Sequence, residues 1–141
     1  MHIRPFNAQD ESAVVALWQR CGLLRSWNNP SRDIARKLAV QAEWFLVVES
    51  ESGDILGSAM VGYDGHRGWI NYLAVDPRCQ GQGIGRQLMA RAEQVLRDAG
   101  CPKLNLQVRD GNRAAEAFYR SLGYQVDEVI SFGKRLIPDA E

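Results

Sequence analysis

The sequence predicts an α+β fold in which a mixed, mostly antiparallel sheet of about seven strands carries helices on both faces. Strand-like apolar runs alternate with segments whose apolar residues recur at helical spacing, in the order β-α-α-β-β-β-α-β-α-β-β. One strand leads through a glycine-rich loop directly into a helix, which is typical of mixed sheets that bind phosphates. The length of 141 residues predicts one domain, residues 1–141.

The first half of the chain supplies four strands and two helices. Residues 2–6 form the first strand, and Asn7 with Asp10 makes a capping-box variant at the start of a helix that Gly22 ends. Asn29 and Pro30 provide a cap and a first-turn proline for a second helix, which we expect to run to about residue 41. The remaining strands of this half are predicted at residues 44–49, 55–63 and 69–75.

The second half begins with the helix after the glycine loop, whose apolar face runs from Ile84 to Ala99 before Gly100 ends it. A strand at residues 103–108 and a helix at 112–122 follow. Two further strands are predicted, at residues 124–127 and 129–137, the second of them interrupted by Gly133.

Composition excludes several classes of protein. The chain has 45% hydrophobic residues, 17 basic and 17 acidic side chains, and no net charge, so we expect neither a nucleic-acid partner nor an anionic membrane partner. It has no apolar run near the ~20 residues of a membrane span and no signal-peptide pattern. Cys21, Cys79 and Cys101 are widely spaced, which predicts free thiols in a reducing cytoplasm and no metal site.

The stretch 71–85 is the part of the sequence most informative about function. Its apolar beginning is a buried strand that Asp76 and Pro77 end. Three glycines follow at alternate positions, Gly81, Gly83 and Gly85. Such a loop can turn its backbone N–H groups toward an anion, and the next helix adds the positive end of its dipole. We therefore expect a phosphate or pyrophosphate ligand.

Two common phosphate loops do not fit this stretch. A P-loop needs Lys followed by Ser or Thr after its last glycine, whereas Gly85 is followed by Arg86 and Gln87. A dinucleotide-binding loop needs its glycines directly after the strand, but five residues separate Val75 from Gly81. A nucleotide-dependent oxidoreductase is therefore disfavoured.

A third loop type matches residue by residue. Residues 80–85, Gln-Gly-Gln-Gly-Ile-Gly, preceded by Leu-Ala-Val-Asp-Pro, resemble motif A of the GNAT family of N-acetyltransferases. A second block at 108–124 reads Val-x-x-x-Asn-x-x-Ala-x-x-Phe-Tyr-x-x-x-Gly-Tyr and resembles motif B of that family. The predicted element order resembles the GNAT fold over essentially the whole chain. The 64–68 turn and the loop around Trp27 further resemble a bacterial subgroup, the YpeA-type acetyltransferases.

The resemblance implies acetyl-CoA as donor, held where the predicted strands 69–75 and 103–108 splay apart. The backbone of 73–75 would pair with the pantetheine arm, the N–H groups of the loop would hold the pyrophosphate, and Asn112 would bond the pantetheine side. Tyr119 would protonate the leaving thiolate. The donor-binding residues so implied are Leu73, Ala74, Val75, Gln80, Gly81, Gln82, Gly83, Ile84, Gly85, Arg86, Asn112 and Tyr119.

The acceptor side is less well defined. An amine must lose a proton before it attacks, and Gln107 stands where several relatives of the family carry a glutamate. The base would then be Asp64, His66 or solvent, although Asp64 and His66 are also ordinary turn formers. Trp27, Arg25, Asp64 and Asn71 are the candidate acceptor-binding residues, and plain surface packing of Trp27 is the alternative.

Two classes of function remain open on the sequence. The first is an N-acetyltransferase acting on a protein N-terminus, a lysine or a small-molecule amine. The second is a catalytically weak acyl-CoA-binding sensor or partner module, for which the missing base is the argument. A homodimer through the C-terminal strands is common in the family that the chain resembles.

Overall fold

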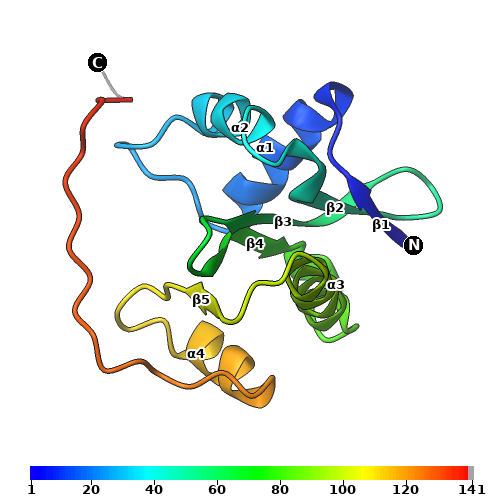
Figure 1. Cartoon of the computed structure of the whole chain (residues 1–141). Helices are drawn as coiled ribbons and strands as arrows, with labels where there is room; N and C mark the ends of the chain where they lie inside the picture. Colours follow the sequence, from blue (N-terminus) through cyan, green and yellow to red (C-terminus); the bar gives the residue numbers. More distant parts are fainter. Residues whose placement is uncertain (140–141) are drawn as a thin grey trace.

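The centre of the molecule is a five-stranded sheet in the order β1-β2-β3-β4-β5 (Figure 1). The computed structural model describes residues 1–139. Neighbouring strands are antiparallel except β4 and β5, which are parallel. The strands are β1 (His2–Pro5), β2 (Phe45–Glu49), β3 (Ile55–Tyr63), β4 (Gly68–Val75) and β5 (Leu104–Leu106).

Helices cover both faces of this sheet, as predicted. They are α1 (Glu11–Arg20), α2 (Pro30–Leu38), α3 (Ile84–Asp98) and α4 (Arg113–Ser121). On one face, α1 and α2 bury Leu17, Trp18 and Ile34 against the sheet. On the other face, α3 buries Leu88 and Met89, and α4 packs beside it. The α+β class and the mixed sheet are confirmed. None of the described helices is long and apolar enough to cross a membrane.

Local signals explain where the N-terminal helices begin and end. The Asn7 side chain accepts from the Gln9 N–H while Asp10 accepts from the Asn7 N–H, so the capping box is present, at a 3-10 turn (Ala8–Asp10) that leads directly into α1. The α2 helix ends at Leu38, earlier than expected, and Gln41 takes a left-handed conformation with φ of 53°. Its side-chain amide pairs with both backbone groups of Tyr63, which ties this segment to the sheet.

The prediction of two C-terminal strands is wrong. Residues 125–139, here called the C-terminal arm, form no strand, and the arm runs in extended form past β5 to α2 (Figure 1). The alternation of apolar residues is present, but a strand also needs a neighbouring edge to pair with its backbone. Within residues 1–139 the arm makes no backbone hydrogen bond to β5. The sheet therefore has five strands instead of about seven.

Candidate functional site

The strands β4 and β5 separate halfway along β4. Their pairing covers only Gly68–Ile70 of β4 with Leu104–Leu106 of β5. From Asn71 to Val75, β4 has no partner on that side within the described residues. An unpaired strand segment offers backbone donors and acceptors to an extended ligand. This unpaired half, here called the splay, contains Leu73, Ala74 and Val75, where the family resemblance implies that the pantetheine arm binds.

A bulge shapes β4 at the splay. Ser58 pairs with Ala74 and Met60 with Asn71, so Tyr72 and Leu73 together stand opposite a single β3 residue. Tyr72 is left-handed there, with φ of 52°. A non-glycine residue holds that conformation only where its surroundings fix it.

Three neighbours fix the bulge residue. The Tyr72 hydroxyl donates to Asp33 Oδ2 at 2.6 Å, and its ring stacks on Trp18 with centroids 3.9 Å apart. The Ser58 hydroxyl donates to the Tyr72 carbonyl at 2.8 Å and accepts from Trp18 Nε1 at 2.9 Å. The bulge is thus held from α1, α2 and β3 together. No sequence signal marked it, because each contact joins distant parts of the chain.

The glycine loop has the geometry of an open cradle. Gly81 and Gly83 have φ of 85° and 82°, and a Cβ added to either would meet nothing within 4 Å. Gly83 is the N-cap of α3 and has no side chain to engage the first-turn N–H groups. Those groups and the helix dipole are therefore available to an anion. This fits the pyrophosphate of acetyl-CoA.

The side chains of the loop divide into two sets. Gln80, Gln82 and Arg86 are exposed, and Ile84 is buried in the core, so only its backbone can face a ligand. Gly85 serves packing, since a Cβ there would lie 3.1 Å from Phe118 Cζ of α4.

Asp76, which the sequence marks as the end of a strand and as part of motif A, anchors the start of the loop. Its carboxylate is fully buried and accepts from Arg78 Nη2 at 2.8 Å and Arg20 Nη2 at 3.1 Å. It also accepts from the Arg78 N–H at 2.9 Å. The bonds from Arg78 hold the pKa of Asp76 well below its usual range. The spacing Asp-x-Arg was a signal for this anchor.

Asn112 and Tyr119 lie on α4. Asn112 is exposed and caps the helix, because its Oδ1 accepts from the Ala115 N–H at 3.1 Å, which leaves its amide N–H groups for a ligand. Burial raises the pKa of Tyr119 to about 12. The Tyr119 ring meets Phe118 and Tyr124 edge to face, and its hydroxyl has no hydrogen-bond partner among residues 1–139.

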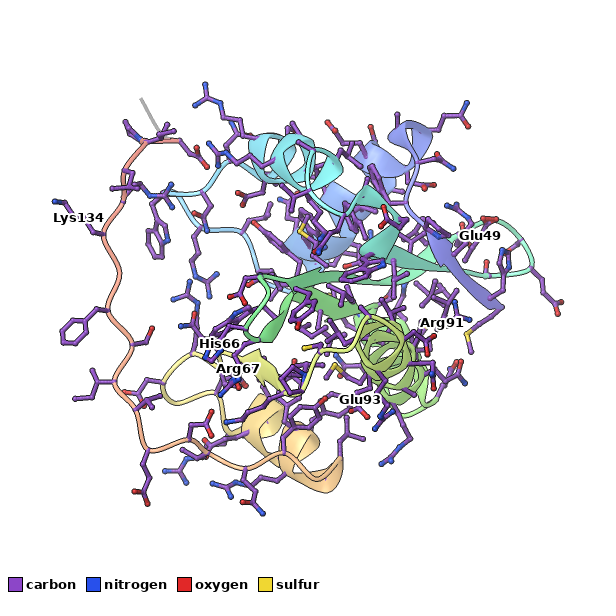
Figure 2. All side chains as sticks on the ribbon, viewed as in Figure 1. Glu49, His66, Arg67, Arg91, Glu93 and Lys134 are labelled. Carbon is purple, nitrogen blue, oxygen red and sulfur yellow. The ribbon has the colours of Figure 1, made fainter. Side chains whose placement is uncertain are left out.

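Asp64 and His66 lie in the β3–β4 hairpin, where Figure 2 labels His66 and Arg67 on the side of the sheet that faces the arm. Asp64 Oδ1 accepts from the N–H groups of His66 and Arg67 at 2.8 and 2.7 Å. These bonds, the one from Arg67 first, lower the pKa of Asp64. A carboxylate held in this way forms the turn and is a weak base. The His66 side chain is exposed.

The candidate acceptor-binding residues come from three parts of the chain. Trp27, in the α1–α2 loop, is 49% exposed, and the Arg109 guanidinium lies 5.6 Å from its ring. Arg109 was missed, because no pattern links it to residue 27. Arg25 instead donates to the Gly22 and Leu24 carbonyls of its own loop. Asn71 is exposed at the mouth of the splay.

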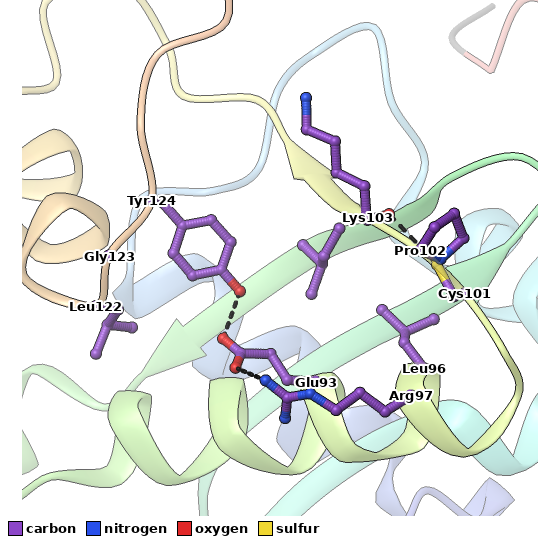
Figure 3. Close-up of a pocket in the computed structure, with 10 residues that line it drawn as sticks. Glu93, Leu96, Arg97, Cys101, Pro102, Lys103, Leu122, Gly123 and Tyr124 are labelled. Atoms are coloured by element: carbon purple, nitrogen blue, oxygen red, sulfur yellow. Dashed lines mark hydrogen bonds and ion pairs between the residues drawn. The ribbon is translucent and has the colours of Figure 1, made fainter.

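One small cavity belongs to the framework rather than to this site. It measures about 290 Å³ and lies between the C-terminal half of α3 and β5 (Figure 3). Across it, the Tyr124 hydroxyl donates to Glu93 at 2.7 Å, and Arg97 approaches the same carboxylate. The bond joins the segment after α4 to α3, at the end of α3 away from Gly83.

Comparisons with known proteins agree on one family. The model of the "Acetyltransferase (GNAT) family" matches residues 10–124. An acetyltransferase of Pectobacterium atrosepticum and one of Yersinia enterocolitica are each 49% identical to this chain over all 141 residues and cover 99% of their own lengths.

Solved structures give the same result. The ribosomal-protein-S18-alanine N-acetyltransferase of Escherichia coli superposes with a TM-score of 0.71 and 28% identity, covering 86% of this chain and 76% of that one. Naa20 of Chaetomium thermophilum, in complex with a bisubstrate analogue, superposes with a TM-score of 0.73 and 26% identity, covering 89% of this chain and 72% of that one.

Proposed function

Because the chain belongs to the GNAT family of acetyltransferases, we propose that it moves the acetyl group of acetyl-CoA to a primary amine, by direct attack in a ternary complex. The observation that carries this proposal is the open glycine loop at the N-terminus of α3, next to the unpaired half of β4. Asn112 and the backbone of 73–75 would hold the pantetheine side, and the loop N–H groups would hold the pyrophosphate.

Tyr119 acts on the departing sulfur. A phenol whose pKa is about 12 stays protonated at neutral pH, so its hydroxyl can donate a hydrogen bond to the developing thiolate. A thiol with a pKa of ~8.5 is a good leaving group and needs no stronger acid. As the C–N bond forms and the C–S bond breaks, the nitrogen loses one proton to solvent and the thiolate takes up one, so the products are the N-acetyl amide and the free thiol of CoA.

The attacking amine must first be neutral, and its ordinary pKa is ~10.4. Asp64 is engaged in its turn, and the Gln107 amide donates to Ser131 Oγ at 2.7 Å. We therefore propose that solvent takes the proton that the ammonium loses before attack. His66 is the remaining side chain of the predicted set that can accept this proton. Trp27 and Asn71 would border the amine as it enters.

The acceptor we would test first is the N-terminal amine of a cytoplasmic protein. The E. coli enzyme at 28% identity is named for an alanine of a ribosomal protein, which makes a peptide a reasonable first substrate here. A lysine and a small-molecule amine are the other two acceptor classes.

A catalytically weak acyl-CoA-binding module is the second candidate, favoured by the glutamine at position 107. Two measurements separate it from the enzyme. Thermal unfolding with acetyl-CoA, with NADH and ATP as controls, tests the donor, because saturation at 100 times Kd adds about 2.7 kcal/mol of stability.

The release of free CoA thiol then tests turnover with three acceptors. The first is a peptide with a free N-terminus and no lysine, the second is an N-acetylated peptide with one lysine, and the third is a small polyamine. A thermal shift without thiol release on any acceptor would establish the binding module, and no shift would remove both candidates.

A further inference from the structure

The chain is poor in lysine. Of its 17 basic side chains, three are lysines, Lys37, Lys103 and Lys134, and the other fourteen are arginines. A lysine amine that loses its proton can attack a thioester, whereas the guanidinium of arginine stays protonated and does not. The surroundings of the three lysines therefore decide which amines of this protein can accept an acetyl group.

Two of the three lysine amines are engaged in contacts. Lys37 of α2 is half-buried, and its Nζ donates to the Val61 carbonyl of β3. Burial lowers the pKa of Lys37, but its amine lies against the backbone of that strand. Lys103 Nζ donates to both carboxylate oxygens of Asp127, at 2.9 and 3.1 Å. Both amines would have to leave these contacts before they could attack a thioester.

Lys134 differs from the other two. It lies on the C-terminal arm, its side chain is exposed, and within residues 1–139 it makes no hydrogen bond or ion pair. Figure 2 shows Lys134 on the outer side of the arm, pointing away from the body of the molecule. Among the lysine amines, that of Lys134 is therefore the one that a second molecule can reach without breaking a contact.

The arm has the form of an extended peptide (Figure 1). Residues 125–138 make no backbone–backbone hydrogen bond within the described part of the chain. Tyr124, just before them, is bonded to Glu93 of α3, and Asp139, just after them, is buried and accepts from Arg36 Nη2 of α2 at 2.7 Å. The two ends are thus held, and the backbone groups between them are open to another molecule.

Apolar side chains flank the Lys134 amine. Alternate residues of an extended segment share one side, which places Phe132 and Leu136 on the side of Lys134. Phe132 is 92% exposed and Leu136 is 84% exposed. Exposed apolar side chains gathered in this way mark an interaction surface. On the acceptor side of the proposed site, the half-exposed ring of Trp27 is an apolar surface that they can contact.

We propose that Lys134 of one copy is acetylated by a second copy, so that the protein modifies its own arm. This rests on the function proposed above. The neutral Nζ attacks the thioester carbonyl of acetyl-CoA bound to the second copy. The C–N bond forms and the C–S bond breaks, the nitrogen loses one proton to solvent, and CoA leaves as the free thiol. The product is an uncharged N-acetyl-lysine.

The open space beside the splay can admit such a segment. It measures about 1630 Å³ and is lined by Asn71, Gln107 and Tyr119, among others. Because Lys134 points away from the body of its own molecule, the site that modifies it belongs to another copy. We therefore expect the rate per molecule to rise with protein concentration.

Mixing two variants tests the proposal. Lys134→Arg keeps the site and removes the acceptor amine, whereas Gly83→Val, which should not bind acetyl-CoA, keeps the amine. In a mixture, acetylated Lys134 can form only on the Gly83→Val copies, and mass spectrometry of proteolytic peptides measures it. Gly83→Val alone should stay unmodified at Lys134. Adding an equal amount of Lys134→Arg should restore the rate to within about threefold of that of the natural chain.

Tyr119→Phe serves as a second slow copy if Gly83→Val folds poorly, and it should be rescued in the same way. A mixture that is no faster than the slow copy alone would overturn modification between copies. Equal acetylation of Lys37, Lys103 and Lys134, or acetylation of Lys134 in Gly83→Val alone, would show direct chemical modification by acetyl-CoA and would also overturn the proposal.

A free peptide acceptor separates this proposal from the function on which it rests. Release of CoA thiol with the peptide, while Lys134 of the natural chain stays unmodified, would overturn the proposal and leave the acetyltransferase intact. No thiol release with any acceptor and no acetylated Lys134 would remove both.

Substitution of the flanking residues gives a second measurement. Phe132→Ser and Leu136→Ser should each slow the acetylation of Lys134 about threefold or more, because they remove apolar contacts with the second copy. Turnover with a free peptide should not change. Val40→Ser, at a side chain that is exposed outside the arm, is the matched control and should change neither rate. Equal acetylation of Lys134 in all three variants would reject recognition through the arm.

Discussion

In the site that we propose, the donor half is built from backbone, and the acceptor half is built from side chains. On the donor side, the loop glycines and the first turn of α3 offer N–H groups from one short stretch of chain. On the acceptor side, Trp27 meets Arg109 across 82 residues, and the arm reaches the same loop, where Arg135 donates to Asn28. We therefore expect donor binding to tolerate exchanges of exposed side chains, whereas each exchange on the acceptor side should change how the acceptor binds.

The largest expected effect comes from the donor half. Gly83→Val adds a β-branched side chain to a residue with φ of 82°, in the open space beside the loop where we propose that the pyrophosphate binds. Acetyl-CoA binding, measured by calorimetry, should be lost.

Gly65→Val is the matched control, because Gly65 has φ of 91° and open space at its Cβ but lies in the β3–β4 hairpin. The Gly65→Val variant should lose a similar amount of stability and still bind acetyl-CoA. Micromolar affinity in Gly83→Val would refute the assignment of the loop.

Tyr119→Phe should have the next largest effect, because the Tyr119 hydroxyl is the group that we propose to act on the departing sulfur. Loss of the hydroxyl should lower kcat by about tenfold to a hundredfold while the Kd of acetyl-CoA changes little. Tyr124→Phe is the control, since that hydroxyl is bonded to Glu93 and should affect only stability. Equal kcat in Tyr119→Phe and the natural chain would take Tyr119 out of the mechanism.

Asp76→Asn tests the anchor of the donor loop. Because the bonds from Arg78 and Arg20 hold the pKa of Asp76 below its ordinary value near ~3.9, the stability they contribute is present above about pH 4. It is lost as the pH falls through the folded-state pKa.

The variant should therefore be less stable than the natural chain at pH 7, and the difference should shrink as the pH falls below about 4. Urea midpoints at several pH values measure this, with Asp98→Asn as an exposed control. A difference that is constant from pH 7 to 3 would contradict the role of the charge.

The smallest effect is expected at the acceptor side. Trp27→Ala removes one wall and the contact with Arg109, so the KM of the acceptor should rise about threefold to tenfold while that of acetyl-CoA stays constant. Trp44→Ala, a tryptophan outside this loop, is a control for general loss of an aromatic ring. An unchanged acceptor KM would leave Trp27 with a packing role only.

The contrast between the halves also explains what could be predicted from the sequence. Left-handed glycines, the caps at Asn7, Asn29 and Asn112, and the apolar face of α3 are local properties, and the structure has each of them. The family that the two motifs suggested is confirmed by the match over residues 10–124.

The parts that could not be predicted depend on contacts between distant segments. The apolar residues of the arm alternate as they do in a strand. Whether its backbone pairs with the sheet depends on the position of the edge strand, which the sequence of the arm does not specify. The environment of Asp64 likewise shows a carboxylate committed to its turn, which the residue type alone left open.

The bulge at Tyr72 has a consequence for how substitutions combine. A left-handed residue costs of order 1–3 kcal/mol, and here Trp18, Ser58 and Asp33 jointly offset it. Once one support is removed and the bulge relaxes, the other two no longer act on the same conformation. The loss of stability in a double variant should therefore be smaller than the sum of the two single losses. A double-mutant cycle across Trp18 of α1 and Asp33 of α2 would report this as a coupling energy between two side chains that both contact Tyr72.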